Sequence, residues 1–199
     1  ALATAAGTTP ERVAIHCVHP HDAPFACLDA QRIVAQYADL PAIVDVDFFQ
    51  KVVQFGAKAL TDSLSRARQL THVAVSKAPV KQVAANRRIL GPNGKVRTMR
   101  GSSSCSDPAL RAEPEGLIDP DLRTIAFYSG EQRIVACHYY ACHPMSHYGK
   151  GQVSPDFCGL ARQLMQAAEP GCTHLYFNGC GGNVAAGKYN DGSAAMRPV

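Results

Sequence analysis

Three histidines, His16, His19 and His21, lie within the short segment HCVHPHDAP. In extended backbone, side chains two residues apart point to the same side, so His19 and His21 can address one site. Asp22 follows directly, close enough to orient an imidazole or to coordinate an ion. Imidazole nitrogens are common zinc ligands, and one member of such a pair can bind metal while its neighbour acts on a substrate. The segment favours a metal site, with a surface loop carrying chance histidines as the open alternative.

A second histidine cluster follows in CHYYACHPMSHYG, which contains His138, His143 and His147. We expect His138 to lie inside an apolar strand as a core histidine. His143 comes at the end of that strand, and strand ends are where open α/β sheets bind ligands. A catalytic zinc ion typically takes three protein ligands and a water molecule. The strand-end histidines of the two segments therefore indicate a metal-dependent hydrolase.

The third chemical feature is a glycine-rich segment, FNGCGGNVAAGKYNDG, that follows an apolar run. Its backbone amides could cradle an oxyanion or a phosphate, and a plain tight turn is an equal alternative. A P-loop is excluded because Lys188 is followed by Tyr189 instead of Ser or Thr. Cys180 could act as a nucleophile with a histidine base, but no local signature supports that reading.

Hydrophobic periodicity predicts the elements that must position these residues. Helical spacing over 44–70, with Asp45 or Asp47 as N-cap, predicts a long helix. A second helix is expected over 155–168, with Ser154 as N-cap and Pro155 in the first turn. Strands are expected over 13–18, 71–80, 123–129, 133–143 and 173–179, with a mostly irregular stretch over 86–120. Alternating helices and apolar strands predict an α/β fold, a mixed sheet flanked by helices.

Composition narrows the classes of partner. The chain has 199 residues, 46% of them hydrophobic and 18% charged, which is globular composition. No uncharged run approaches the roughly 20 residues of a membrane span, so we expect no span. Residues 51–100 carry eleven basic residues and one acidic residue, but Phe55 is the only aromatic side chain among them. Nucleic-acid binding is therefore not expected, and a solvated helix face or a surface attracted to anionic lipid or substrate explains the charge.

The eight cysteines include no CxxC pair, which argues against a zinc ribbon or a thioredoxin motif. Cys17, Cys137 and Cys142 lie within apolar runs. Buried free cysteine behaves as a small hydrophobic residue, so we expect these three to be buried and most of the eight to be reduced.

Six segments, taken in chain order, resemble the N-terminal catalytic domain of the neutral/alkaline ceramidase family. The segment VHPHDAP is similar to the family's THTHSGP, ACHPMSH to its VH-x-TSM, and VSPDFCGLAR to its ISPDNKGYAS. NRR, EGLIDPDLRTIAFYS and FNGCGGNV also match family motifs in the same order. Each motif is weak alone, and the shared order is what makes the resemblance specific.

The resemblance implies a zinc-dependent amidase that hydrolyses the N-acyl bond of ceramide-like lipids. Its partner would be a small-molecule or lipid amide substrate, with a peripheral membrane surface as a further option. By position, His19 and His143 would be Zn²⁺ ligands, and His21 would lie beside the reacting carbonyl. Arg87 would be an active-site arginine close to the substrate. A secreted or periplasmic location is also implied by the family alone.

Two departures from the family pattern affect the expected chemistry. The family's serine, long discussed as a nucleophile, corresponds to Ala185, and its aspartate corresponds to Asn183. The family's remaining zinc ligands, a glutamate and a tyrosine, would come downstream of this chain. We therefore expect residues 1–199 to be a single α/β domain or an interior part of a larger catalytic domain. The competing hypothesis is a non-catalytic homologue that keeps the fold and binds a lipid or protein partner.

Overall fold

The computed structural model describes residues 1–149 and 151–193. The chain divides into two compact units, one helical and one built around a sheet. The helical unit contains Ala1–His16 and Ala23–Gln69, and the sheet unit contains Cys17–Asp22 and the chain from Leu70 onward.

The helical unit is dominated by one long amphipathic helix, α3. The prediction of this helix is confirmed, and its N-cap is Asp45, whose carboxylate accepts a 2.9 Å hydrogen bond from the Phe48 backbone N–H. Among the described residues, no helix combines the length and the apolar character needed to cross a membrane. The helices of this unit are α1 (Leu2–Ala5), η1 (Pro10–Arg12), α2 (Leu28–Val34) and α3 (Val46–Leu64).

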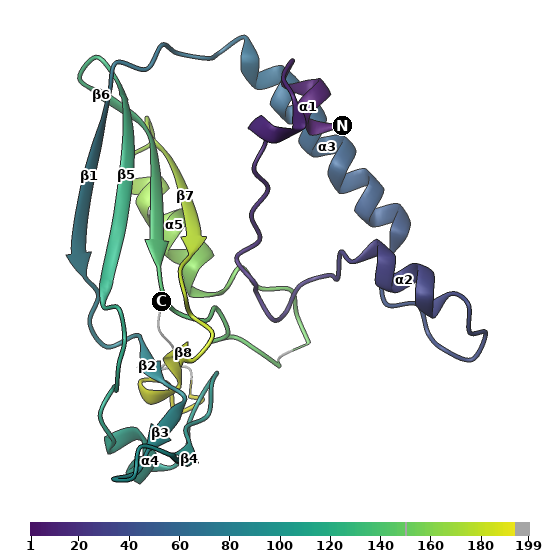
Figure 1. The fold of residues 1–199 in the computed structure, drawn as a ribbon. Helices are drawn as coiled ribbons and strands as arrows, with labels where there is room; N and C mark the ends of the chain where they lie inside the picture. Colours follow the sequence, from purple (N-terminus) through teal and green to yellow (C-terminus); the bar gives the residue numbers. More distant parts are fainter. Residues whose placement is uncertain (150, 194–199) are drawn as a thin grey trace. The chain divides into compact units, whose positions relative to one another are not determined.

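The sheet unit confirms the predicted α/β class with a mixed sheet. Its four strands have the order β1-β5-β6-β7, antiparallel except for the parallel pair β6 and β7 (Figure 1). Parallel pairing needs a crossover connection, and helix α5 provides it between β6 and β7. The elements are β1 (His72–Pro79), β5 (Asp121–Ser129), β6 (Gln132–Tyr140), α5 (Asp156–Ala168) and β7 (Thr173–Asn178).

The carboxyl ends of β6 and β7 lead into the segment that contains His143 and into the glycine-rich loop. In the parallel register, Tyr140 is paired with Asn178, so both strands end at the same edge. His143 follows the first strand and the glycine-rich loop follows the second. A small core under this edge is formed by Ala84, Tyr140, Cys142, Phe157, Cys158 and Val184.

The stretch 86–120 is more ordered than expected. It contains a local hairpin, β3 with β4, and the strand β2, whose partner is distant in the chain and could not be indicated by local periodicity. The buried Arg100 guanidinium donates hydrogen bonds of 2.9 to 3.2 Å to four backbone carbonyls, which holds the stretch together. The elements are β2 (Ala85–Asn86), which pairs with β8 (Val184–Ala185), β3 (Arg88–Leu90), which pairs with β4 (Val96–Met99), and α4 (Pro108–Ala112). Outside this stretch, η2 (Ala186–Lys188) follows β8.

Two predictions about the first histidine segment are wrong. Residues 13–18 form no strand in the described part of the chain, and Cys17 is exposed, whereas Cys137 and Cys142 are buried as predicted. Instead of joining a ladder, the Val18 carbonyl accepts a 2.6 Å hydrogen bond from the Asn178 side chain. An apolar run becomes a strand only when a neighbouring strand forms hydrogen bonds with its backbone N–H and C=O groups. Here the Val18 carbonyl bonds a side chain instead.

Candidate metal centre

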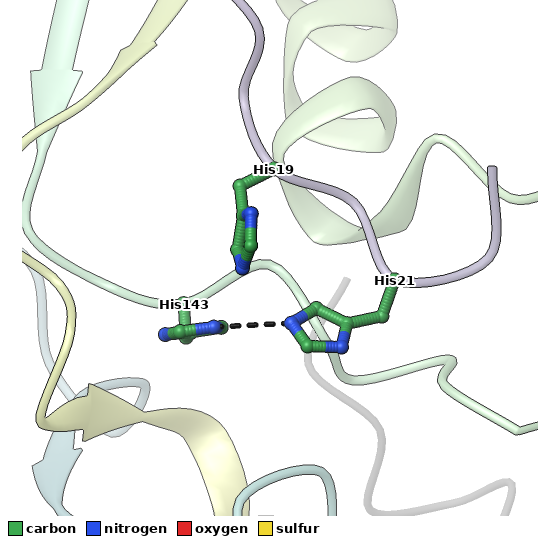
Figure 2. A group of neighbouring side chains, drawn as sticks. All are labelled: His19, His21 and His143. Carbon is green, nitrogen blue, oxygen red and sulfur yellow. Dashed lines mark hydrogen bonds between the residues drawn. The ribbon is translucent and has the colours of Figure 1, made fainter. Parts of the chain in front are cut away.

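His19, His21 and His143 converge on one point within the sheet unit. His19 and His21 come from the loop 17–22, and His143 follows β6 (Figure 2). The ring centroids are 4.8 Å apart for His19 and His21, 4.9 Å for His19 and His143, and 5.1 Å for His21 and His143. One nitrogen from each ring lies within 4.8 Å of the other two. The structure thus brings together the three histidines that the sequence singled out.

His143 is oriented by contacts at both its backbone and its ring. Its backbone N–H donates to the Val184 carbonyl at 2.8 Å, and its Nδ1 lies 3.2 Å from the Gly181 carbonyl oxygen. A carbonyl only accepts, so Nδ1 carries the proton and Nε2 keeps its lone pair. This is the arrangement that orients an imidazole ligand toward a metal.

Gly181 is required by this packing. A Cβ at this position would lie 3.1 Å from the Cys142 carbonyl carbon and 3.2 Å from the His143 nitrogen. Within the loop, the Gly181 N–H donates to Gly179 at 2.8 Å and the Val184 N–H donates to Gly181 at 2.9 Å. These amides are used internally, so the tight-turn interpretation fits this part of the loop better than an anion nest.

Loop 17–22 places its histidines through an unusual backbone. His19 has a φ of 60°, in the left-handed region that residues with a side chain rarely adopt. Asp22 ties the loop down, because its carboxylate accepts from the Gly149 N–H at 3.2 Å and its carbonyl accepts from the Ser154 N–H at 3.1 Å. Asp22 therefore anchors the histidine loop, a role the sequence did not indicate, and it is not among the grouped metal donors.

Burial and neighbouring charges keep the His21 and His143 rings neutral. Partial burial lowers the pKa of His21, and the neighbouring His143, His19 and Arg87 lower it further. Burial also lowers the pKa of His143; the hydrogen bond to Gly181 raises it, and Arg87 and His19 lower it. Both rings are therefore unprotonated near pH 7, the state in which an imidazole can donate a lone pair to a metal.

The spacing of the nitrogens fits a divalent metal ion. His21 Nε2 lies 3.0 Å from His143 Nε2. Two nitrogens bound tetrahedrally at about 2.0–2.1 Å from zinc would stand about 3.3 Å apart, so small ring movements would accommodate an ion. The geometry does not separate His21 from His19 as a ligand, and three imidazoles leave one tetrahedral position open.

Arg87 and His143 both contact the glycine-rich loop, Arg87 at the Gly182 carbonyl and His143 at the Gly181 carbonyl. The Arg87 backbone N–H donates to Asn183 at 2.8 Å. The guanidinium donates to the Ser102 hydroxyl at 3.1 Å and to the Gly182 carbonyl, and its buried Nε makes no hydrogen bond. The side chain is thus held against the glycine-rich loop.

Asp156 is a positioning residue that the sequence analysis missed. Its buried carboxylate accepts from the backbone N–H groups of Ser146 at 3.1 Å, His147 at 3.0 Å and Phe157 at 2.8 Å. It thereby fixes the loop that follows His143. The signal was present as an aspartate at the start of a predicted helix, but that pattern ordinarily indicates only a helix terminus.

The two remaining candidate positions, Cys180 and Ala185, differ in their exposure to solvent. Cys180 is exposed in the glycine-rich loop, and Ala185 is 1% exposed in β8. Ala185 also forms an isolated parallel bridge with His143, so the position of the family's serine does lie beside the histidine cluster.

Comparison with solved structures relates the fold to ceramidases. The chain is similar to a structure described as ceramidase complexed with C2, with a TM-score of 0.52 and 14% identity over 80% of this chain and 28% of that one. A neutral ceramidase from Pseudomonas aeruginosa aligns with a TM-score of 0.47 and 16% identity over 68% of this chain and 21% of that one. The chain therefore spans about a quarter of the length of these proteins. No protein-family model and no curated protein matches it. The similarity to the first structure supports a ceramidase-like fold.

Proposed function

We propose that this chain supplies the histidine side of the metal centre of a ceramidase-like hydrolase. The substrate would be the N-acyl amide bond of a ceramide-like lipid, and the products a fatty acid and a sphingoid base. The single observation that carries the proposal is the convergence of His19, His21 and His143 beside the carboxyl ends of β6 and β7. The ceramidase-like fold and the ordered motifs supply the substrate class.

His19 and His143 would hold a zinc ion, and His21 would either bind it as well or lie beside the reacting carbonyl. When bound, such an ion supplies Lewis acidity, which polarises a carbonyl group and lowers the pKa of water. Because the pKa of His21 is lowered, its ring is neutral near pH 7 and can accept a proton from attacking water.

Arg87 would stabilise the negative charge that develops on the amide oxygen. A guanidinium that is held in place needs little reorganisation during the reaction. The bonds to Ser102 and Gly182 hold the side chain in place and leave its charge at the site.

Water, instead of a serine, is the nucleophile that we propose. Ala185 has no hydroxyl group, although it lies beside His143 in the position of the family's serine. No covalent serine intermediate can form at that position.

A hollow beside the centre could receive part of the substrate. Its volume is about 460 Å³, within the range of small-molecule sites. Ala141, two residues before His143, lies in its wall together with Gly179 and Cys180. Aromatic and aliphatic side chains line one part of it: Leu117, Ile118, Tyr139, Tyr140 and Val184. The charged residues Asp119, Asp121 and Arg123 line the rest. The apolar part of this lining is compatible with an acyl chain.

A non-catalytic homologue is the second candidate, and Ala185 and Asn183 favour it. Asn183 is engaged structurally, since its amide oxygen accepts from Arg88 at 2.8 Å and its amide nitrogen donates to Asn86 at 3.0 Å. Under this candidate the chain would bind a lipid or a protein partner without cleaving it.

The deciding experiment measures fatty-acid release from a short-chain ceramide by the full-length protein with zinc supplied. Activity that is lost in His143→Ala and kept in His72→Ala, an exposed histidine on β1, would support the hydrolase. Ceramide binding without turnover by the unaltered protein would establish the non-catalytic candidate instead.

A further inference from the structure

A second group of metal-ligating side chains lies at the other end of β7. Glu169, Cys172 and His174 come from the segment EPGCTH, which joins α5 to β7. Their donor atoms all lie within 4.8 Å of one another. His174 is four residues before the end of β7, roughly 13 Å along the strand from the glycine-rich loop. This donor group is separate from the three-histidine centre.

His174 is oriented by a chain of hydrogen bonds. Its Nδ1 lies 3.0 Å from His138 Nε2, and His138 Nδ1 lies 2.9 Å from the Thr124 hydroxyl. The two imidazole rings stack with an interplanar angle of 5°. The remaining nitrogen, His174 Nε2, therefore faces the other donors in a fixed direction.

That nitrogen is buried without a hydrogen bond. His174 is 3% exposed, and its Nε2 is 3.5 Å from the nearest Glu169 oxygen. A buried polar atom of this kind is costly unless something pairs with it. An ion between Nε2 and the carboxylate would satisfy both groups.

Glu169 and Cys172 supply the other two donors. Arg133 makes a two-point contact with the Glu169 carboxylate, Nε to Oε1 at 3.0 Å and a second bond to Oε2, which holds the carboxylate in place. Cys172 is 1% exposed, and its thiol donates to the Thr173 carbonyl at 3.9 Å.

We infer that Glu169, Cys172 and His174 form a second metal site, suited to zinc. One carboxylate, one thiolate and one imidazole make a donor set that zinc accepts in tetrahedral geometry. On binding, the thiol proton is released to solvent, one carboxylate oxygen turns to the ion and the other stays on Arg133. The site joins the end of α5 to the start of β7, so its role is to stabilise that connection.

Cobalt titration tests this site without reference to any activity. In the His143→Ala background, Co²⁺ should produce a thiolate-to-cobalt charge-transfer band with one ion bound, and Zn²⁺ should displace it. Cys172→Ser should abolish the band. Cys158→Ser is the matched control, because its buried thiol bonds the Pro155 carbonyl at the N-cap of α5, and it should keep the band.

A second variant covers the case in which Cys172→Ser does not fold. Glu169→Gln changes a side chain that is 36% exposed, and it should keep the thiolate band while weakening zinc affinity at least tenfold. Zinc should also raise the melting temperature of the His143→Ala protein but not of the His143→Ala/Cys172→Ser protein. A band that persists in Cys172→Ser, or no thiolate band in any variant, would overturn the inference.

Discussion

His143 Nε2 lies 3.0 Å from His21 Nε2, although 122 residues separate the two histidines. The contact joins the loop 17–22 to the end of β6, and His19 completes the group with its ring 4.9 Å from that of His143. Two neutral imidazoles at this distance share one proton, and replacing that proton with a metal ion requires little rearrangement. The first predictions follow from this relationship.

Removing either of the two proposed zinc ligands should strongly weaken metal binding at the centre. We expect His19→Ala and His143→Ala to lower the zinc affinity of this site by at least about 100-fold, since each removes a direct ligand. Competition with a chromophoric chelator, in a Cys172→Ser background that removes the second site, measures the affinity. His72→Ala is the control and should bind zinc normally. Unchanged affinity in His143→Ala would show that these rings do not form a metal centre.

Replacing Arg87 should alter the titration of the histidines. Arg87→Gln removes a positive charge that lowers the pKa of His21 and His143, so both pKa values should rise. Nuclear magnetic resonance of the imidazole protons measures this in the metal-free protein. Arg97→Gln, an exposed arginine paired with Glu113, should leave both values unchanged. If the full-length protein has the proposed activity, kcat should fall about 100-fold with Arg87→Gln. Unshifted histidines would place Arg87 outside the site.

The proposed water mechanism predicts a small effect of restoring the family's serine. Ala185→Ser should change kcat only a few fold, because the hydroxyl is not needed. His21→Ala should lower kcat by roughly 10²–10⁴-fold if it transfers a proton. Excess chelator should abolish turnover in the full-length protein. Trapping of a covalent acyl intermediate would contradict the mechanism and bring Cys180 back into consideration.

Asp156 should contribute to both stability and metal affinity. Asp156→Asn replaces an acceptor oxygen with a donor that faces backbone N–H groups, which should cost about 2–3 kcal/mol of unfolding free energy. Loosening of the loop after His143 should also weaken zinc binding. Urea denaturation and zinc competition measure the two effects. Asp62→Asn removes an exposed ion pair with Lys58 and should change stability by less than about 1 kcal/mol. Equal stability of the two variants would show that Asp156 is not an anchor.

Alkaline pH should destabilise the fold through its buried thiols. Burial raises the pKa of Cys158 to about 11 from an ordinary value of 9.0. The unfolded state therefore loses this proton first, so stability is full below pH 9 and falls as the pH rises toward 11. One thiol accounts for about 2–3 kcal/mol over that range. Cys158→Ala should flatten the decline in urea denaturation, and Cys180→Ala, an exposed control, should not. Identical slopes would refute this explanation.

The sequence by itself determined the elements that depend on local pattern. Helix α3 follows from helical spacing and the Asp45 cap, and strands β5 to β7 follow from apolar runs bounded by turns. In α5 the boundary shifts by one residue, with Pro155 at the N-cap and the Ser154 hydroxyl accepting from the Asp156 N–H at 3.0 Å. Periodicity, caps and turns depend on residues close together in the chain, so the sequence alone can predict them.

The histidines could be identified as candidates from the sequence, because residue type and position at the end of an apolar run are both local features. Their meeting was decided by the tertiary structure. The prediction that His19 follows a strand fails, yet the loop 17–22 still reaches His143. Asn178 holds it through Val18, and Gly149 holds it through Asp22.

Other functional contacts depended on the tertiary structure entirely. His138 was correctly expected in the core, but its bond to His174 arises only because β6 and β7 pair in parallel. The carboxylate of Asp156 and the buried donors of Arg100 likewise find partners through folding. A buried polar group without a hydrogen-bond partner costs free energy, which favours folds that supply a partner. That cost arises only when folding removes the group from water.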